Sequence, residues 1–241
     1  MNSLRDIQKE FKKSANPSKA KILQGFFKTK KGEYAEGDIF HGVTVPKTRI
    51  IAKRFCDSIS LEETQELLHS KIHEERLCAL IILIEKYKNK KTTPIEQKKI
   101  YEIYLKNTKY INNWDLVDLS AQHIVGNYLY LHPTEQKVLD TLATSELLWE
   151  RRIAILSTFY FIYKKEFYLT LKLSKVLLND KEDLMHKAVG WMLREVGKRG
   201  GMIEEEKFLQ THYKQMPRTM LRYAIERFPE KKRLAYLKGT V

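Results

Sequence analysis

The sequence predicts an all-α protein, built as a helical-repeat superhelix (an α-solenoid) with a concave basic groove. The 241 residues include only 10 Gly and 6 Pro, fewer than a turn-rich β-sandwich or barrel would use. Apolar residues recur every three or four positions, which is the spacing of one helix face, and convincing two-residue alternation is absent. Similar amphipathic runs also return at nearly regular intervals. Together these observations favour stacked helices over any sheet.

Prolines mark the places where several of these helices should begin, because proline is favoured in the first helical turn. The prolines that precede a periodic run are Pro17, Pro46, Pro94, Pro133 and Pro217. Ahead of Pro46, residues 28–46 (KTKKGEYAEGDIFHGVTVP) contain several glycines and predict one long loop. Long ordered loops are often functional, so this segment is a candidate for a role beyond connection.

Five amphipathic runs resemble one another. They are EERLCALIIL (74–83), NWDLVDLSAQHIVG (113–126), WERRIAILSTF (149–159), MHKAVGWMLREVG (185–197) and PRTMLRYAIERF (217–228). Paired helices repeating every 30–45 residues or so are typical of HEAT or armadillo solenoids. The sequence therefore predicts a single HEAT-like domain over residues 1–241. The alternative is that unrelated amphipathic helices align loosely at this spacing.

The charge of the chain is strongly basic and unevenly distributed. The formal net charge is +14. Residues 1–56 carry 13 basic against 5 acidic side chains, residues 57–180 carry 17 of each, and residues 181–241 carry 14 against 8. Basic excess at both ends of a helical chain favours a polyanion, with nucleic acid as the leading class. An acidic protein is an alternative. A membrane surface is disfavoured because no helix sets Lys and Arg opposite a Trp, Phe and Leu face.

The remaining composition predicts a cytoplasmic protein with reduced thiols. No apolar run reaches the roughly 18 residues of a membrane span, and the N-terminus has charges where a signal peptide needs apolar residues. Cys56 and Cys78 do not make a disulfide framework. Cys78 lies in the apolar run LCALIIL and is expected in the core.

Aligning the runs on their apolar faces places Asp118, Arg152, Lys187 and Arg218 at similar positions, 34, 35 and 31 residues apart. Trp114 precedes Asp118 by four residues, and Trp191 follows Lys187 by four. Four residues make about one helical turn, so each tryptophan shares a face with its partner. The repeat thus predicts one groove that holds an acid and two tryptophans among bases.

An aspartate in a cationic groove needs an explanation, because it would repel a phosphate backbone. Asp118 could cap a helix or pair with Arg152. The functional alternative is that it faces a developing positive charge, as in the oxocarbenium-like sugar formed when an N-glycosidic bond breaks. A purine alkylated at N3 or N7 is already cationic, so it needs no general acid to leave. One carboxylate would then suffice, with Arg152 holding a phosphate nearby.

Signals for other chemistry are weaker. His69 and His73 have the i, i+4 spacing of metal ligands on a helix, but the run is HSKIH, without the glutamate of HExxH or an evident third ligand. Phosphate-binding, dinucleotide-binding and GxSxG motifs are absent. We therefore expect no metal site.

Four segments together resemble the AlkD-like DNA alkylation repair proteins. They are YINNWDLVDLSA, LWERRIAILSTF, DLMHKAVGWMLREVGK and MPRTMLRYAIERF, and the likeness includes KGEYAEGDIFHGVTVP. The resemblance implies a HEAT-like DNA glycosylase that removes N3- and N7-alkylpurines from double-stranded DNA, with no cofactor and no obligate protein partner. It implies a catalytic Asp118, with Trp114, Arg152 and Trp191 completing the site, and excision without deep base flipping. Phe26 departs from the pattern, since active relatives have a tyrosine there.

There are two alternatives to a DNA glycosylase. The family also contains paralogues that bind DNA structures without strong base excision, and a repeat protein can be a scaffold for a protein partner. Basic side chains on the ladder and near the chain ends are candidate phosphate contacts. They are Lys47, Arg49, Lys187, Arg194, Arg218 and Arg222.

Overall fold

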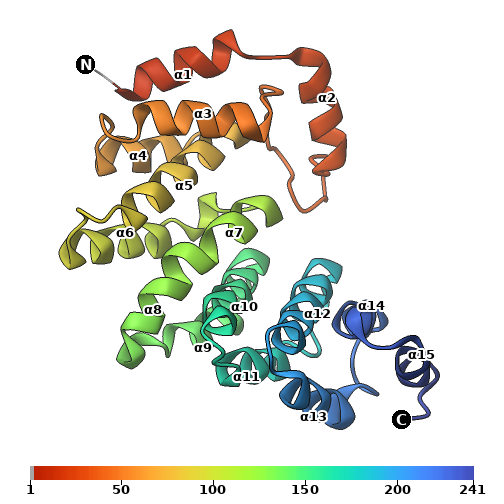
Figure 1. Ribbon diagram of the computed structural model, residues 1–241. Coiled ribbons are helices and arrows are strands. Elements are labelled where there is room, and N and C mark those ends of the chain that lie inside the picture. Colours follow the sequence, from red (N-terminus) through yellow and green to blue (C-terminus); the bar gives the residue numbers. More distant parts are fainter. Residues whose placement is uncertain (1–2) are drawn as a thin grey trace. The chain divides into compact units, whose positions relative to one another are not determined.

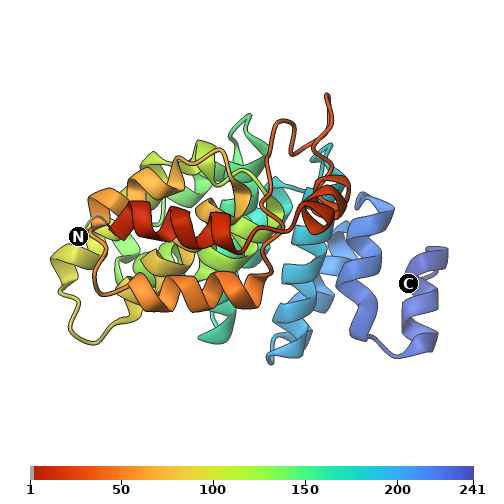
Figure 2. The same ribbon diagram turned by 90° about the horizontal axis from the view of Figure 1, so that it is seen from above.

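The computed structural model describes residues 3–241, and the chain forms two compact units, Met1–Leu116 and Val117–Val241 (Figures 1 and 2). Helices make up nearly all of the regular structure. Across the described residues there is no strand, and the only β-type pairing is an isolated parallel bridge between Ile39 and Ile72. The predicted all-α helical-repeat fold is confirmed. Across the same residues, every helix is too short or too polar to cross a bilayer.

The first unit is organised around one buried helix, α5. Its helices are α1 (Ser3–Lys13), α2 (Pro17–Phe26), α3 (Val45–Phe55), α4 (Leu61–Leu68), α5 (His73–Lys88), α6 (Pro94–Lys106), the 3-10 turn η1 (Thr108–Tyr110) and the start of α7 (Trp114–Ala121). Helices α3, α4 and α6 all pack on α5. Residues 73–84 of α5 are buried without interruption, and Cys78 is fully enclosed, as predicted.

Helices begin at or next to four of the five prolines that were predicted to mark helix starts. Pro17 and Pro94 begin α2 and α6, Pro46 lies in the first turn of α3, and Pro217 immediately precedes α14. Side chains reinforce two of these starts: Asn16 caps α2, and Thr93 forms a capping box with Glu96 on α6. Pro133 opens only a short 3-10 turn. Residues 28–44 form the predicted long loop.

The second unit consists of helices that pack on one another along the chain. They are the end of α7, the π-helical segment η2 (Gln122–Gly126), α8 (Asn127–Leu131), η3 (Pro133–Glu135), α9 (Val138–Ala143), α10 (Leu148–Tyr163), α11 (Tyr168–Val176), α12 (Asp183–Lys198), α13 (Met202–His212), α14 (Arg218–Ala224), η4 (Ile225–Arg227) and α15 (Glu230–Lys238). Helix α10 packs on α9, α11 and α12, and α12 packs on α13 and α14. Alternate helices therefore pack on one another, η2 on α10, α10 on α12 and α12 on α14, as stacked repeats do.

A π-helical segment interrupts the predicted helix 113–126. The chain runs from α7 through Gln122–Gly126 directly into α8. Gly126 lets this segment approach α10, because a β-carbon there would lie 2.2 Å from the Ser157 carbonyl oxygen. π-segments within helices are frequent at functional sites, and this one directly follows the helix that carries Asp118.

A buried glutamate makes the stability of the second unit depend on pH. Glu205 of α13 is 1% exposed, and burial, aided by the charge of Glu206, raises the pKa of its carboxyl to about 8. The folded pKa lies above the unfolded value, so the folded state binds more protons between about pH 4.5 and 8 and stability falls as pH rises through that range. Glu205→Gln should remove this loss, of order 2–4 kcal/mol. Urea unfolding of both proteins at pH 5 and pH 8.5 measures it.

The exposed neighbour Glu204 supplies the matched control. Glu204→Gln should leave the pH dependence of unfolding as it is in the wild type. If the free energy of unfolding changed with pH by the same amount in the wild type and in Glu205→Gln, the prediction would be wrong, because the Glu205 carboxyl would then not have a raised pKa.

Candidate functional site

Helix α7 carries both Trp114 and Asp118, one helical turn apart, as the sequence predicts. The Trp114 ring is half-buried and stacks on Phe27, with ring centroids 5.3 Å apart and an interplanar angle of 22°. Phe26 meets the same ring edge-on at 6.0 Å, and its own side chain is 61% exposed. The backbone N–H of Trp114 donates to Oδ1 of buried Asn113 at 2.8 Å. Trp114 is therefore held by its backbone and by one face of its ring.

Asp115, the residue after Trp114, belongs to a buried ionic cluster. His73 of α5 is 1% exposed. Its Nδ1 lies 3.0 Å from Asp38 Oδ2, and its Nε2 lies 2.8 Å from Asp115 Oδ2. Burial lowers the pKa of His73, but the hydrogen bonds to Asp115 and Asp38 outweigh burial and raise that pKa above its usual value. The geometry fits an imidazolium that joins two carboxylates.

Arg76 completes this cluster. Its Nη2 donates to Asp38 Oδ1 at 2.7 Å and to Asn112 Oδ1 at 3.1 Å, and its Nη1 donates to the carbonyl of Ser70. Burial alone would raise the pKa of Asp38, but His73 and Arg76 together lower it. The ionised Asp38 thus fixes the end of the 28–44 loop against α5.

Glu74 holds the same loop through its backbone. The Glu74 carboxylate is buried and accepts hydrogen bonds from the backbone N–H groups of His41, Gly42 and Val43, at 2.8–3.1 Å. A carboxylate that satisfies three consecutive amides replaces the pairing that a strand would otherwise supply. The loop is therefore ordered although it has almost no regular structure.

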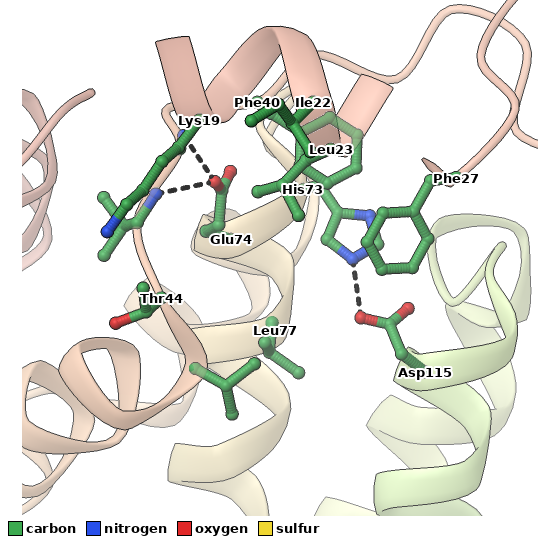
Figure 3. A pocket seen from close by; sticks show the side chains of 13 residues that line it. Lys19, Ile22, Leu23, Phe27, Phe40, Thr44, His73, Glu74, Leu77 and Asp115 are labelled. Carbon is green, nitrogen blue, oxygen red and sulfur yellow. Dashed lines mark hydrogen bonds and ion pairs between the residues drawn. The ribbon is translucent and has the colours of Figure 1, made fainter. Parts of the chain in front are cut away.

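A cavity of about 170 Å³ lies between α2, the loop and α5 (Figure 3). Its walls are mainly aliphatic and aromatic, and include Leu23, Phe40 and Leu77. His73 and Glu74 also border it, but their polar atoms are engaged in the bonds described above. Lys19 and Thr44 add two further polar side chains to its lining. The cavity is therefore mainly apolar, with a few polar side chains on its walls.

In the second unit, Asp118 and Arg152 form a bidentate ion pair. Arg152 Nε donates to Asp118 Oδ1 and Nη2 donates to Oδ2, both at 2.8 Å. The third donor, Nη1, binds the carbonyl oxygen of Leu184 at 2.5 Å. The Arg152 side chain is 6% exposed and that of Asp118 is 19% exposed. Asp118 thus reaches the surface while its counter-ion stays inside.

This arrangement changes the expectation for Arg152. The sequence left open whether Asp118 pairs with Arg152, and the structure contains that pair. Each of the three guanidinium nitrogens donates one N–H within the protein, at 2.5–2.8 Å, and the side chain is 6% exposed, so at most the two remaining N–H groups could meet a phosphate. Arg152 acts in this structure as the partner of Asp118.

Trp191 of α12 is half-buried and has its own aromatic surroundings in the second unit. Its ring meets Phe159 of α10 edge-on, with centroids 5.6 Å apart. Phe159 also contacts Tyr163, and the Arg199 guanidinium lies over the Tyr163 ring at 3.8 Å. Trp191 is therefore fixed at one edge by packing rather than by a hydrogen bond to Asp118 or Arg152.

The six candidate phosphate contacts differ in their surroundings. Arg49 and Arg222 are exposed, and Lys47 is half-buried. Lys187 pairs with Asp183 at 2.7 Å. Arg194 pairs with Glu226 and lies 3.6 Å from Glu195. Arg218 donates to the carbonyl of Leu237 at 2.6 Å. Binding a phosphate through the last three would compete with these contacts.

His69 and His73 do not converge on a common point. His69 Nε2 lies 2.6 Å from Asn107 Oδ1, and its ring stacks on Tyr110, whereas His73 joins Asp38 and Asp115. Within residues 3–241, no group of three or more His, Cys, Asp or Glu side chains is arranged to hold a metal ion.

The sequence reasoning missed the segment HEER (73–76), whose four side chains are all buried. The available signal was its position, since four charged or titratable residues directly precede the fully apolar run LCALIIL. Polar groups entering a core require partners, and the long loop supplies most of them.

The fold and these two clusters define an all-α helical-repeat protein with a paired, partly exposed aspartate and half-buried tryptophans. The sequence model of the family described as DNA alkylation repair enzyme matches residues 7–228. The chain belongs to this family, and its role is in the repair of alkylated DNA.

A solved structure has the same fold. It is described as a predicted DNA alkylation repair enzyme from Enterococcus faecalis, and it superposes with a TM-score of 0.70 at 17% sequence identity, covering 90% of this chain and 98% of that one. At this identity the likeness establishes the fold alone. No curated protein matches the sequence.

Proposed function

We propose that the protein is a DNA glycosylase that hydrolyses the N-glycosidic bond of N3- or N7-alkylated purines in double-stranded DNA. The observation that carries the proposal is Asp118, a partly exposed carboxylate fixed by a buried arginine in a basic chain of the DNA alkylation repair family. A surface that recruits a polyanion gains nothing in affinity from a carboxylate. The pair with Arg152 explains how Asp118 is accommodated, and the family of the chain supports a chemical use for its partly exposed carboxylate.

The reaction needs one carboxylate because the leaving base already carries a positive charge. As the bond between C1′ and the purine nitrogen breaks, its electrons neutralise the base and leave an oxocarbenium-like sugar. Asp118 stabilises this cation electrostatically. A water then adds to C1′, and Asp118 accepts its proton. The products are the neutral alkylpurine and an abasic site.

Arg152 would keep the Asp118 carboxylate in place for this step. The two parallel N–H···O bonds fix the plane of the carboxylate. A carboxylate that is already oriented needs no reorganisation when the positive charge develops.

Trp114 and Trp191 would supply aromatic surface for the cationic base. The face of an indole attracts a cation by about 0.5–2 kcal/mol. Both rings are half-buried, and in each the contacts described above leave part of the ring at the surface.

The direct test uses duplex DNA that contains 7-methylguanine or 3-methyladenine. The proposal expects release of the free alkylpurine and formation of abasic sites, detected by chromatography and by alkaline strand cleavage. Salt-dependent binding without base release would identify a non-catalytic DNA-binding paralogue instead. Absence of duplex binding at low salt would favour a scaffold.

Arg222 should contribute to DNA affinity without regard to sequence. It is exposed on α14, so Arg222→Ala should weaken binding evenly across duplexes and lower the slope of log affinity against log salt by about one. Fluorescence anisotropy titrations between low and moderate salt measure this slope. Arg233→Ala is the control, because Arg233 is paired with Glu230 within α15. A sequence-selective effect of Arg222→Ala would contradict a phosphate contact.

A further inference from the structure

Residues 112–115, which lead into α7, are held by two side chains from the first turn of α5. Arg76 binds the Asn112 side chain at 3.1 Å, and His73 binds the Asp115 carboxylate at 2.8 Å. The buried side chain of Asn113 accepts the backbone N–H of Trp114. Trp114 thus lies inside a segment that is anchored on both sides by α5.

The same histidine also supports the Trp114 ring. Phe27 lies between them: its ring centroid is 4.9 Å from that of His73 and 5.3 Å from that of Trp114. Phe40 stacks on His73 at 4.6 Å. The position of Trp114 therefore depends on His73 twice, through Asp115 along the backbone and through Phe27 across the rings.

We propose that His73 is the positioning residue for Trp114, which it holds by bridging Asp38 of the 28–44 loop to Asp115 of α7. His73 does not touch substrate in this account. An effect of His73 on catalysis rests on the proposed function, in which Trp114 faces the cationic base. Its effect on the mobility of Trp114 can be measured without any reaction.

The hydrogen bonds from His73 to both Asp38 and Asp115 distinguish a positioning residue from a side chain that only fills space in the core. Asp38 would remain bound to Arg76 if His73 were replaced, so the loop keeps one of its anchors. Within the part of the chain that the structure describes, Asp115 has no such second cation and otherwise accepts only the backbone N–H of Leu116. Loss of the His73 bond should therefore loosen the α7 side of the bridge more than the loop side.

Two variants break the same bond from opposite ends. His73→Gln shortens the bridge on α5, and Asp115→Ala removes its acceptor on α7 while leaving the His73–Asp38 bond. Asp115 lies in the first turn of α7, and its side chain is 18% exposed. Asp115→Ala therefore tests the bridge even if His73→Gln does not fold. His69→Gln is the control, since His69 lies four residues earlier and binds Asn107 instead.

The primary readout is the mobility of Trp114 as the single tryptophan, in a Trp149→Phe, Trp191→Phe background. Both variants should raise acrylamide quenching of Trp114 at least about twofold and lower its anisotropy, because a ring freed from its supports moves on the nanosecond scale. The double variant should add little, as expected when two changes remove one interaction. His69→Gln should change neither quantity.

The second readout uses wild-type tryptophans and single-turnover base release. The variants should lower the rate at saturating protein about tenfold while DNA affinity stays within about twofold, because positioning affects the reacting complex more than encounter. Unchanged quenching and anisotropy in both variants would overturn the proposal. Mobile Trp114 together with no base release by the wild type would overturn the proposed function and leave the positioning role intact.

Discussion

Asp118→Asn lowers the rate of alkylpurine release by about 100-fold or more, if the carboxylate stabilises the sugar cation. Asparagine has the same shape, but it carries no charge and cannot accept the proton of the attacking water. Its amide N–H₂ would also face a donor of Arg152, where the wild type has two matched N–H···O bonds of 2.8 Å. Single-turnover release of 7-methylguanine from duplex DNA, at saturating protein, measures the chemical step directly.

DNA affinity separates this effect from a loss of binding. Asp118→Asn makes the net charge more positive by one, so duplex affinity should stay equal or rise slightly. Asp140→Asn is the matched control: it makes the same change of charge in the second unit, at a surface pair with Lys172. A release rate for Asp118→Asn close to that of Asp140→Asn would remove Asp118 from the catalytic role.

The sequence predicts the fold well because the fold follows from local rules. Helical spacing of apolar residues identifies the buried faces, and prolines with capping residues identify most starts, as at Thr93 and Pro94. Pro133 is the exception, since it opens only a 3-10 turn before α9. The π-helical segment after α7 escapes such rules, because it accompanies the close approach of Gly126 to α10, a tertiary contact.

The candidate site is predictable only in part, for a physical reason. Spacing on one helix places Trp114 and Asp118 on a common face, and the repeat makes Arg152 a reasonable partner for Asp118. The HEER segment depends instead on where the 28–44 loop returns to α5, and pairs such as His73 with Asp38 are 35 residues apart in sequence. No periodic pattern of residues predicts where this loop packs against α5. The only sign of it in the sequence is the presence of charged residues where a core helix begins.

Arg152→Ala should separate the two roles that can be assigned to this arginine. Removing it leaves the Asp118 carboxylate and the Leu184 carbonyl without their donors. Breaking one side of a buried ion pair costs about 3–5 kcal/mol, and the lower end applies because Asp118 is partly hydrated. Urea unfolding should therefore show a loss of about 3 kcal/mol, and the release rate should fall on the order of tenfold or more because the carboxylate is no longer oriented.

The salt dependence of DNA binding distinguishes these roles. If Arg152 serves as the counter-ion of Asp118, the slope of log affinity against log salt stays at its wild-type value in Arg152→Ala. If Arg152 holds a phosphate, the slope falls by about one, as it should in Arg222→Ala. Arg152→Lys keeps the charge but not the paired N–H donors. Partial recovery of stability with little recovery of rate would show that the geometry of the pair, rather than its charge alone, prepares Asp118 for the reaction.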